Sequence, residues 1–247
     1  MRGLGTILNV VAILVGASLG VVIGHRLPER TRRTVTDALG LVTLVIGALN
    51  IASLRDDAYR EAVGDGGTLL IVLGALLIGG IAGSLLRIED RLEAVGGWIQ
   101  SKLQRGKGSE SRATFVNGFV DASLVFCIGP LAILGSLSDG LGRGIEQLAL
   151  KSVLDGFASL AFAASLGWGV AASALAVGVW QGALTILAVV VGSFLSTALI
   201  ASVTATGGVL LLGVGLRLLN IRQVAVGDLL PALLVAPLLT LLVSALR

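Results

Sequence analysis

The fold class is decided by the stretch LGTILNVVAILVGASLGVVIG, residues Leu4 to Gly24. It holds no charged residue, and a helix that crosses a bilayer needs about 20 consecutive apolar residues. The stretch lacks a clear small-x-small cleavage site, so we predict a retained helix and not a secretory signal. Its apolar residues are continuous and do not alternate with polar ones, which favours a membrane helix over a barrel strand.

Comparable apolar stretches recur along the whole chain. The sequence is 55% hydrophobic and 13% charged, with a mean hydropathy of +0.97, whereas soluble domains are roughly a quarter charged. We therefore predict an all-α, polytopic integral membrane protein with about eight transmembrane helices. These helices are expected at residues 4–24, 35–54, 66–86, 113–137, 145–166, 167–195, 198–219 and 226–246, the sixth being one long helix or a broken pair.

The polar segments lie between these helices. Residues 25–33 predict a basic turn, because Pro28 prevents the first helix from continuing. Residues 55–65 predict a mixed-charge loop. Residues 87–104 alternate charged and apolar side chains at a spacing typical of an amphipathic helix on the membrane surface. Residues 105–112 are polar and glycine-containing, which indicates a flexible linker.

The basic residues predict the orientation of the chain. In an eight-helix arrangement, twelve of the 18 Lys and Arg residues fall in loops on one side and five on the other. Since cytoplasmic loops carry the excess of positive charge, we expect both termini outside, in the cytoplasmic (inner) membrane of a bacterium. We attribute the net charge of +3 to these loops and expect no nucleic-acid partner. With one Cys and one His, neither a disulfide framework nor a Cys/His metal cluster can form, and no cofactor is expected.

Two parts of the sequence resemble each other. Residues 5–18 match residues 182–194 with one gap, and residues 38–51 match residues 208–221, both copies of this second match ending in Leu-Asn-Ile. Five crossings separate the first and sixth helices, so the copies would point in opposite directions. Such inverted-topology repeats are common in secondary transporters. The alternative is chance similarity between helices rich in Leu, Val and Gly.

We expect one membrane domain over residues 1–247 with four consecutive parts. These are the first repeat helices at 1–86, the amphipathic cytoplasmic segment and linker at 87–112, the central helices at 113–166, and the second repeat helices at 167–247.

Three charged residues fall inside the predicted central helices. Charges are costly at the centre of a membrane helix and persist where they face a partner or a cavity. Lys151 and Asp155 are spaced i, i+4, so they can pair on one helix face, and Asp121 occupies the matching position of the preceding helix. We interpret the three as a midplane site in which the carboxylates bind a cation or proton. The alternative is a structural network that locks the two helices together.

Other polar residues accompany these charges. Ser123, Ser152 and Ser159 would add hydroxyl oxygens, and Pro130 predicts a kink or break in the fourth helix. Amides within or at the ends of the apolar runs are expected to cross-link helices, with Asn117 kept as a binding candidate; they are Asn9, Asn50, Asn117, Gln181 and Asn220. Small residues spaced four apart predict close helix packing without a direct functional role; they are Gly16, Gly20, Gly24, Gly79 and Gly83.

The central motifs resemble a known family. The stretches ASLVFCIGPLAILG (122–135) and KSVLDGFAS (151–159) are similar to the YqgA/YdfK-like family of bacterial and archaeal membrane proteins, a domain-of-unknown-function family. Gly5-Thr-Ile-Leu-Asn9 and the later Asn220-Ile221 and Leu229-Leu-Pro-Ala232 also resemble it. The likeness covers nearly the whole chain. It implies this membrane architecture, and family members are often labelled transport proteins.

These observations favour a secondary transporter or channel for a small ion or solute, and not an enzyme. Its expected partners are the lipid bilayer, the transported ion or solute and a second copy of the chain in a homodimer. The first alternative is a non-catalytic structural or assembly protein of the membrane. The second is an intramembrane aspartyl-type enzyme, which would need two facing carboxylates.

Overall fold

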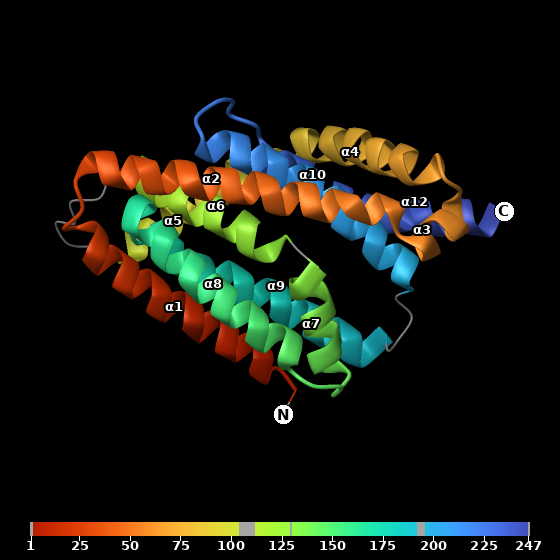
Figure 1. Cartoon of the computed structure of the whole chain (residues 1–247), viewed down its shortest axis with the longest axis horizontal. Helices are drawn as coiled ribbons and strands as arrows, with labels where there is room; N and C mark the ends of the chain where they lie inside the picture. Colours follow the sequence, from red (N-terminus) through yellow and green to blue (C-terminus); the bar gives the residue numbers. More distant parts are fainter. Residues whose placement is uncertain (1, 104–111, 129, 192–195, 247) are drawn as a thin grey trace. The chain divides into compact units, whose positions relative to one another are not determined.

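The computed structural model describes residues 2–103, 112–128, 130–191 and 196–246 (Figure 1). Within these ranges the regular structure is helical and no strand occurs. The helices are α1 (Leu4–Gly24), α2 (Glu29–Ile51), η1 (Ala52–Arg55), α3 (Asp57–Val63), α4 (Gly67–Leu86), α5 (Ile88–Leu103), α6 (Arg112–Cys127), α7 (Pro130–Gly140), α8 (Glu146–Leu166), α9 (Gly169–Val191), α10 (Thr197–Leu218), α11 (Val226–Leu229) and α12 (Ala232–Leu246).

Seven helical segments of the described chain are long and apolar enough to cross a membrane. They are α1, α2 with η1, α4, α8, α9, α10, and α11 with α12. An eighth span is present if the bent pair α6 and α7 counts as one. Large apolar side chains point outward from these spans, with Val179 75% and Leu85 79% exposed, as expected where lipid takes the place of water. The predicted all-α membrane fold is confirmed, with seven such spans in the described chain and an eighth if the bent pair is one span.

The chain divides into two compact units. Unit 1 comprises Met1–Gly40, Leu92–Cys127 and Leu131–Gly192, and unit 2 comprises Leu41–Arg91, Ile128–Pro130 and Ser193–Arg247. Unit 1 thus contains α1, α6, α7, α8 and α9, and unit 2 contains η1, α3, α4, α10, α11 and α12. Helices α2 and α5 contribute residues to both units.

In unit 1, α1 and α8 lie side by side and run in the same direction (Figure 1). A Cβ atom on Gly16 would lie 2.1 Å from the carbonyl oxygen of Gly156, and one on Gly20 would lie 2.2 Å from that of Leu160. These distances are far below van der Waals contact, so only glycine permits this approach of the two backbones. The predicted packing role of the glycine stripe on α1 is confirmed.

In unit 2, α4 packs against α11 and α12 through a second glycine stripe. A Cβ on Gly79 would lie 2.3 Å from the backbone nitrogen of Ala232, and one on Gly83 would lie 1.9 Å from the carbonyl oxygen of Asp228. Helices α2 and α10 also approach closely where Gly47 lies against Gly208. Small residues therefore set the helix spacing in both units.

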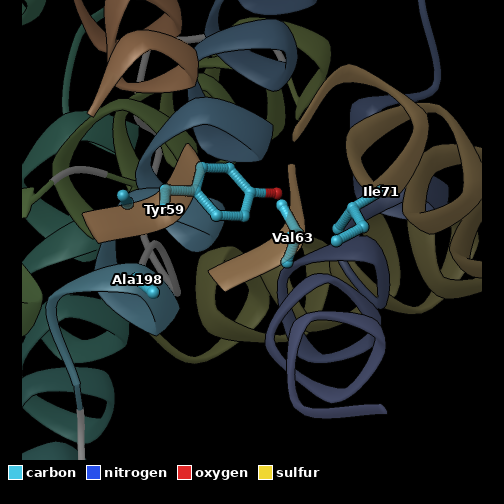
Figure 2. Packing of buried hydrophobic residues seen from close by; sticks show 5 residues of the cluster. Tyr59, Val63, Ile71 and Ala198 are labelled. Carbon is cyan, nitrogen blue, oxygen red and sulfur yellow. The ribbon is translucent and has the colours of Figure 1, made fainter. Parts of the chain in front are cut away.

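Tyr59 is the centre of a small apolar cluster in unit 2 (Figure 2). Its neighbours there are Val63, Ile71, Ala198 and Ala201. The fully buried Tyr59 hydroxyl donates a hydrogen bond to the carbonyl oxygen of Thr68 at 3.3 Å. Burial raises the pKa of Tyr59 to about 12, and a hydrogen bond with Thr240 opposes this shift only in part.

Several boundaries differ from the sequence predictions. The predicted basic turn at residues 25–33 is wrong in its second half, because α2 already begins at Glu29, whose carboxylate pairs with Arg33 one turn later. The predicted loop at 55–65 contains the short helix α3, since Asp56 accepts a hydrogen bond from the Tyr59 amide and Gly64 ends the helix at φ 83°.

The structure also shows how the sixth predicted helix, the amphipathic segment and the last predicted helix are built. Within residues 167–195 the structure has one helix, α9, with residues 192–195 outside the described part. The amphipathic segment forms α5, and the predicted linker lies outside the described residues except for Arg112, which begins α6. The last predicted helix is divided at residues 230–231 into α11 and α12, and Pro237 lies inside α12.

Candidate functional site

The buried charges of α8 meet a polar residue of α1. The Nζ atom of Lys151 donates to Oδ2 of Asp155 at 2.5 Å, and Nδ2 of Asn9 donates to the same oxygen at 2.9 Å. Asn9 is fully buried, and Lys151 and Asp155 are 6% and 7% exposed. The helical i, i+4 spacing aligns the charged pair, and the glycine contacts hold α1 close enough for the amide to reach it.

This arrangement makes the charges tolerable inside a membrane span. A buried ion must be paired and hydrogen-bonded, because its desolvation costs several kcal/mol. Here the ammonium neutralises the carboxylate and Asn9 adds a second donor. The Asn9 Oδ1 atom, by contrast, has no hydrogen-bond partner among the described residues. One end of this amide is therefore engaged while the other presents an acceptor inside the protein.

The predicted serine positions make mainly backbone contacts. Ser152 donates to the carbonyl oxygen of Leu148 at 2.6 Å within its own helix. Ser159 contacts the carbonyl oxygens of Gly156 at 2.9 Å and of Ile13 at 3.2 Å, so it joins α8 to α1. Both side chains are buried. Since these hydroxyl protons are used by the backbone, the two serines support the helix pair and contribute at most acceptor oxygens.

The remaining candidates, Asn117, Asp121 and Ser123, lie on α6. Gly118 packs on Leu166, and the ring of Phe126 contacts that of Phe162 edge-on at 5.9 Å, so α6 runs antiparallel to α8. Asp121 lies between these two contacts in the sequence of α6 and is buried. Ser123 is half-buried and Asn117 is exposed.

A break in the fourth predicted helix separates α6 from α7. Helix α6 ends at Cys127, α7 begins at Pro130, and the two are bent by 64°. Proline suits the first position of a helix, since its missing amide hydrogen is not needed there. The bend directs α7 across the start of α1, where Asp139 accepts hydrogen bonds from the amides of Gly3 at 2.9 Å and Gly5 at 3.0 Å.

Asp139 is a buried carboxylate that the sequence did not predict as a site residue. It follows an apolar run and precedes a glycine-rich turn, a setting typical of a loop. In the structure it is 2% exposed and satisfies amides at the N-terminus of α1. An anion in this position is also favoured by the helix dipole.

A charge network in unit 2 was likewise not predicted. Glu89 and Arg217 form a buried ion pair, and the second Glu89 oxygen accepts from the amide of Gly227 at 2.6 Å. The Glu89 amide donates to Asp228 at 2.9 Å. Residue spacing could not reveal this network, because its members are far apart in the chain. It ties the start of α5 to the end of α10 and the beginning of α11.

Comparisons with known proteins give the family. A family model described as a protein of unknown function (DUF554) matches residues 4–241. The uncharacterized membrane protein YdfK of Bacillus subtilis is 30% identical over 98% of this chain and 97% of its own length. The uncharacterized protein YqgA of Escherichia coli is 29% identical over 94% of each chain. No solved structure matches.

These matches confirm the resemblance that the central motifs indicated. The family model begins at the first residue of α1 and ends within α12, so it spans both units. Both relatives are named as uncharacterized, so their names give no activity. The chain belongs to the DUF554 family of proteins of unknown function and is similar to the membrane protein YdfK over nearly its whole length.

Proposed function

We propose that this protein is a secondary transporter or channel for a small ion or solute. Its translocation site would be the polar centre of unit 1, defined here as Lys151, Asp155 and Asn9. The observation that carries the proposal is a charged pair buried in a membrane-spanning helix, with a second helix donating an amide hydrogen bond to its carboxylate. Ionisable groups at such depth mark ion and substrate pathways in membrane proteins.

Energetics support a role beyond holding helices together. A buried ion pair seldom adds net stability over well-packed apolar residues of similar volume, because desolvation offsets its Coulomb energy. The glycine contacts between α1 and α8 already provide close packing without it. The broken helix formed by α6 and α7 is a second feature common in transporters, which build their sites from discontinuous helices.

The inverted repeat is part of the proposal. If the sequence match between residues 5–18 and 182–194 reflects duplication, α1 and α9 are equivalent helices of two oppositely oriented halves. Both belong to unit 1 and they contact each other. Alternating access in transporters with such repeats moves one half against the other around a midplane site.

The location, orientation and assembly of the protein are part of the same proposal. We propose the cytoplasmic membrane as the location, with both termini outside, and a homodimer as the assembly. We also propose that the protein is not an enzyme. An aspartyl mechanism needs two facing carboxylates, whereas the contacts of the Asp155 carboxylate are with Lys151 and Asn9.

The structural alternative has one observation in its favour: both Asp155 contacts are made within the protein, as they would be in a purely stabilising network. Fluxes of ions and small solutes into proteoliposomes can separate the two functions. We compare the intact protein, Asp155→Asn, the paired variant Lys151→Met with Asp155→Asn, and the control Glu29→Gln, which alters an exposed ion pair.

For transport, flux of at least one solute is expected with the intact protein and the control. It should be lost in the paired variant even though that variant folds without an uncompensated charge. If the intact protein carries none of the solutes, or if the paired variant transports as well as the control, the proposal is refuted.

A further inference from the structure

Buried polar groups gather beside the Lys151–Asp155 pair without hydrogen-bond partners. Among the described residues, no partner is found for either amide atom of Gln181, for Oδ1 of Asn9, or for the hydroxyls of Thr6, Ser136 and Thr185. Each of these five side chains is at most 7% exposed. Leaving one buried polar group unpaired costs about 1–3 kcal/mol, so a concentration of them is unexpected unless they bind something.

Packing contacts place these groups at one level of unit 1. Gly178 of α9 lies against Val10 of α1, and Gln181 and Thr185 follow on the same face of α9, one and two turns later. The two helices run antiparallel, since α9 follows α8 through a short turn and α1 is parallel to α8. The side chains beyond Gly178 therefore meet the part of α1 that precedes Val10.

Helix α7 closes the same region. Asp139 bonds to the amide of Gly5, next to Thr6, and a Cβ on Gly140 would lie 2.4 Å from the carbonyl oxygen of Thr185. Ser136 precedes these two residues by one turn of α7. Asn9 lies one turn beyond Thr6 and holds Asp155. Helices α1, α7, α8 and α9 thus each bring polar groups to one place.

The local charge favours a cation. Among the described buried residues of α1, α7, α8 and α9, two are carboxylates, Asp139 and Asp155, whereas Lys151 alone is cationic. In unit 2 the buried charges balance, Glu89 against Arg217. An excess of buried negative charge attracts a positive ion, and the unpaired hydroxyl and amide oxygens are acceptors suited to coordinate one.

The ligand chemistry favours a monovalent ion. No group of three or more His, Cys, Asp or Glu residues in the described part of the chain could hold a metal ion. The groups that gather here are mostly neutral oxygens, and hard divalent cations are usually bound with carboxylate ligands. Sodium ions in transporters, by contrast, are coordinated by neutral carbonyl oxygens among others.

We propose that Thr6, Asn9, Ser136, Gln181 and Thr185 form a binding site for a monovalent inorganic cation next to the Lys151–Asp155 pair. If the protein is a transporter or channel, as proposed above, this cation is the transported or coupled ion, and only that role of the cation rests on the proposed function. Binding itself requires no transport. The unpaired Asn9 oxygen would join the cation site to the charged pair.

The test is the thermal unfolding of the purified protein in detergent, with choline chloride replaced by sodium, potassium or lithium chloride at constant ionic strength. Ligand binding to the native state stabilises it. With at least one of the three ions we expect a saturable rise in Tm, about 5–10 °C at a concentration 100-fold above Kd. Equal Tm values in all four salts would overturn the proposal.

Two variants locate the site. Gln181→Leu and Thr185→Val remove unpaired polar atoms, so both should fold and match or exceed the intact protein in choline chloride. We expect the half-saturating cation concentration to rise at least about tenfold in each. The matched controls, Gln147→Leu and Thr34→Val, alter exposed residues of the same types and should respond like the intact protein. An unchanged cation response in both site variants would overturn the proposal.

Binding and transport can fail separately. A cation-dependent Tm without flux in any proteoliposome assay would uphold the cation site and refute transport. Solute flux that is independent of the cation, together with Tm values that are equal in all salts, would uphold transport and overturn the cation site.

Discussion

Removing one member of the Lys151–Asp155 pair should destabilise the protein far more than removing both charges. At a separation of 2.5 Å, two unit charges attract by about 7 kcal/mol at an effective dielectric constant of 20. Much of this offsets the desolvation of the two ions. Breaking a buried pair on one side leaves an uncompensated charge and costs about 3–5 kcal/mol.

The double-mutant cycle uses Lys151→Met, Asp155→Asn and their combination. In the combined variant the amide introduced at position 155 is neutral and can still accept from Asn9, so most of the lost stability should return. The expected coupling energy is about 2–4 kcal/mol. Reversible unfolding in mixed micelles, followed by the loss of helical circular dichroism, gives the free energies.

The exposed pair of Glu29 and Arg33 on α2 serves as the control, with an expected coupling below about 1 kcal/mol. Energetic coupling of the buried pair is refuted if the single substitutions at Lys151 and Asp155 each cost less than about 1 kcal/mol, or if their effects on the free energy of unfolding simply add.

Three other predictions concern the packing and the buried groups. Gly20→Ala should destabilise the protein by about 1–3 kcal/mol, because its Cβ would lie 2.2 Å from a carbonyl oxygen of α8. The control Gly182→Ala places its Cβ in open space and should be neutral or stabilise the protein by up to about 1 kcal/mol. Equal changes in the Tm of the two variants would contradict the close packing of α1 on α8. Glu89→Gln should cost about 3–5 kcal/mol through the uncompensated Arg217, and unfolding of this variant at the wild-type midpoint would exclude a stabilising role for the pair. Tyr59, the single tyrosine of the chain, should form tyrosinate only near pH 12 in the folded protein, because burial raises its pKa. Its contribution to stability should be complete below about pH 10, the pKa of an unfolded tyrosine, and should be lost as the pH rises toward 12; a tyrosinate absorbance with its midpoint near pH 10 in the native protein would be inconsistent with the buried cluster.

The sequence predicted the spans well because apolar length is a local property. Helices α1, α4, α8 and α10 agree with their predicted ranges to within about two residues. The i, i+4 pairing of Lys151 with Asp155 was equally local, and the structure shows it. The predicted packing role of Gly16, Gly20 and Gly24 followed from their spacing alone, and the structure confirms it.

Long-range partners could not be read from the sequence. Asn9 was interpreted as a general helix cross-link, and only the packing of α1 on α8 shows that it reaches Asp155. The amphipathic pattern of residues 87–104 predicts Glu89 on a surface helix, yet Glu89 pairs with Arg217 inside unit 2.

The Leu-Asn-Ile sequence shared by the two copies of the repeat likewise does not determine where a helix ends. Asn220 follows the end of α10 in a left-handed conformation with φ 54°, which asparagine tolerates better than most residues. Asn50 lies within α2, where the chain continues into η1. The same three letters therefore end one helix and continue another, because the residues that follow decide whether the helix can go on.

Transport requires that the polar centre of unit 1, together with the cation site beside it, opens to water. Its most direct test is the reaction of Thr185→Cys with a charged, membrane-impermeant thiol reagent in proteoliposomes, after the native Cys127 has been replaced by alanine. Leu175→Cys, on the lipid-exposed face of the same helix, is the control. We expect the thiol reagent to modify the cysteine at position 185 and not the cysteine at position 175. A protein that remains unmodified at 185, while a cysteine introduced in an exposed loop reacts fully, would contradict it.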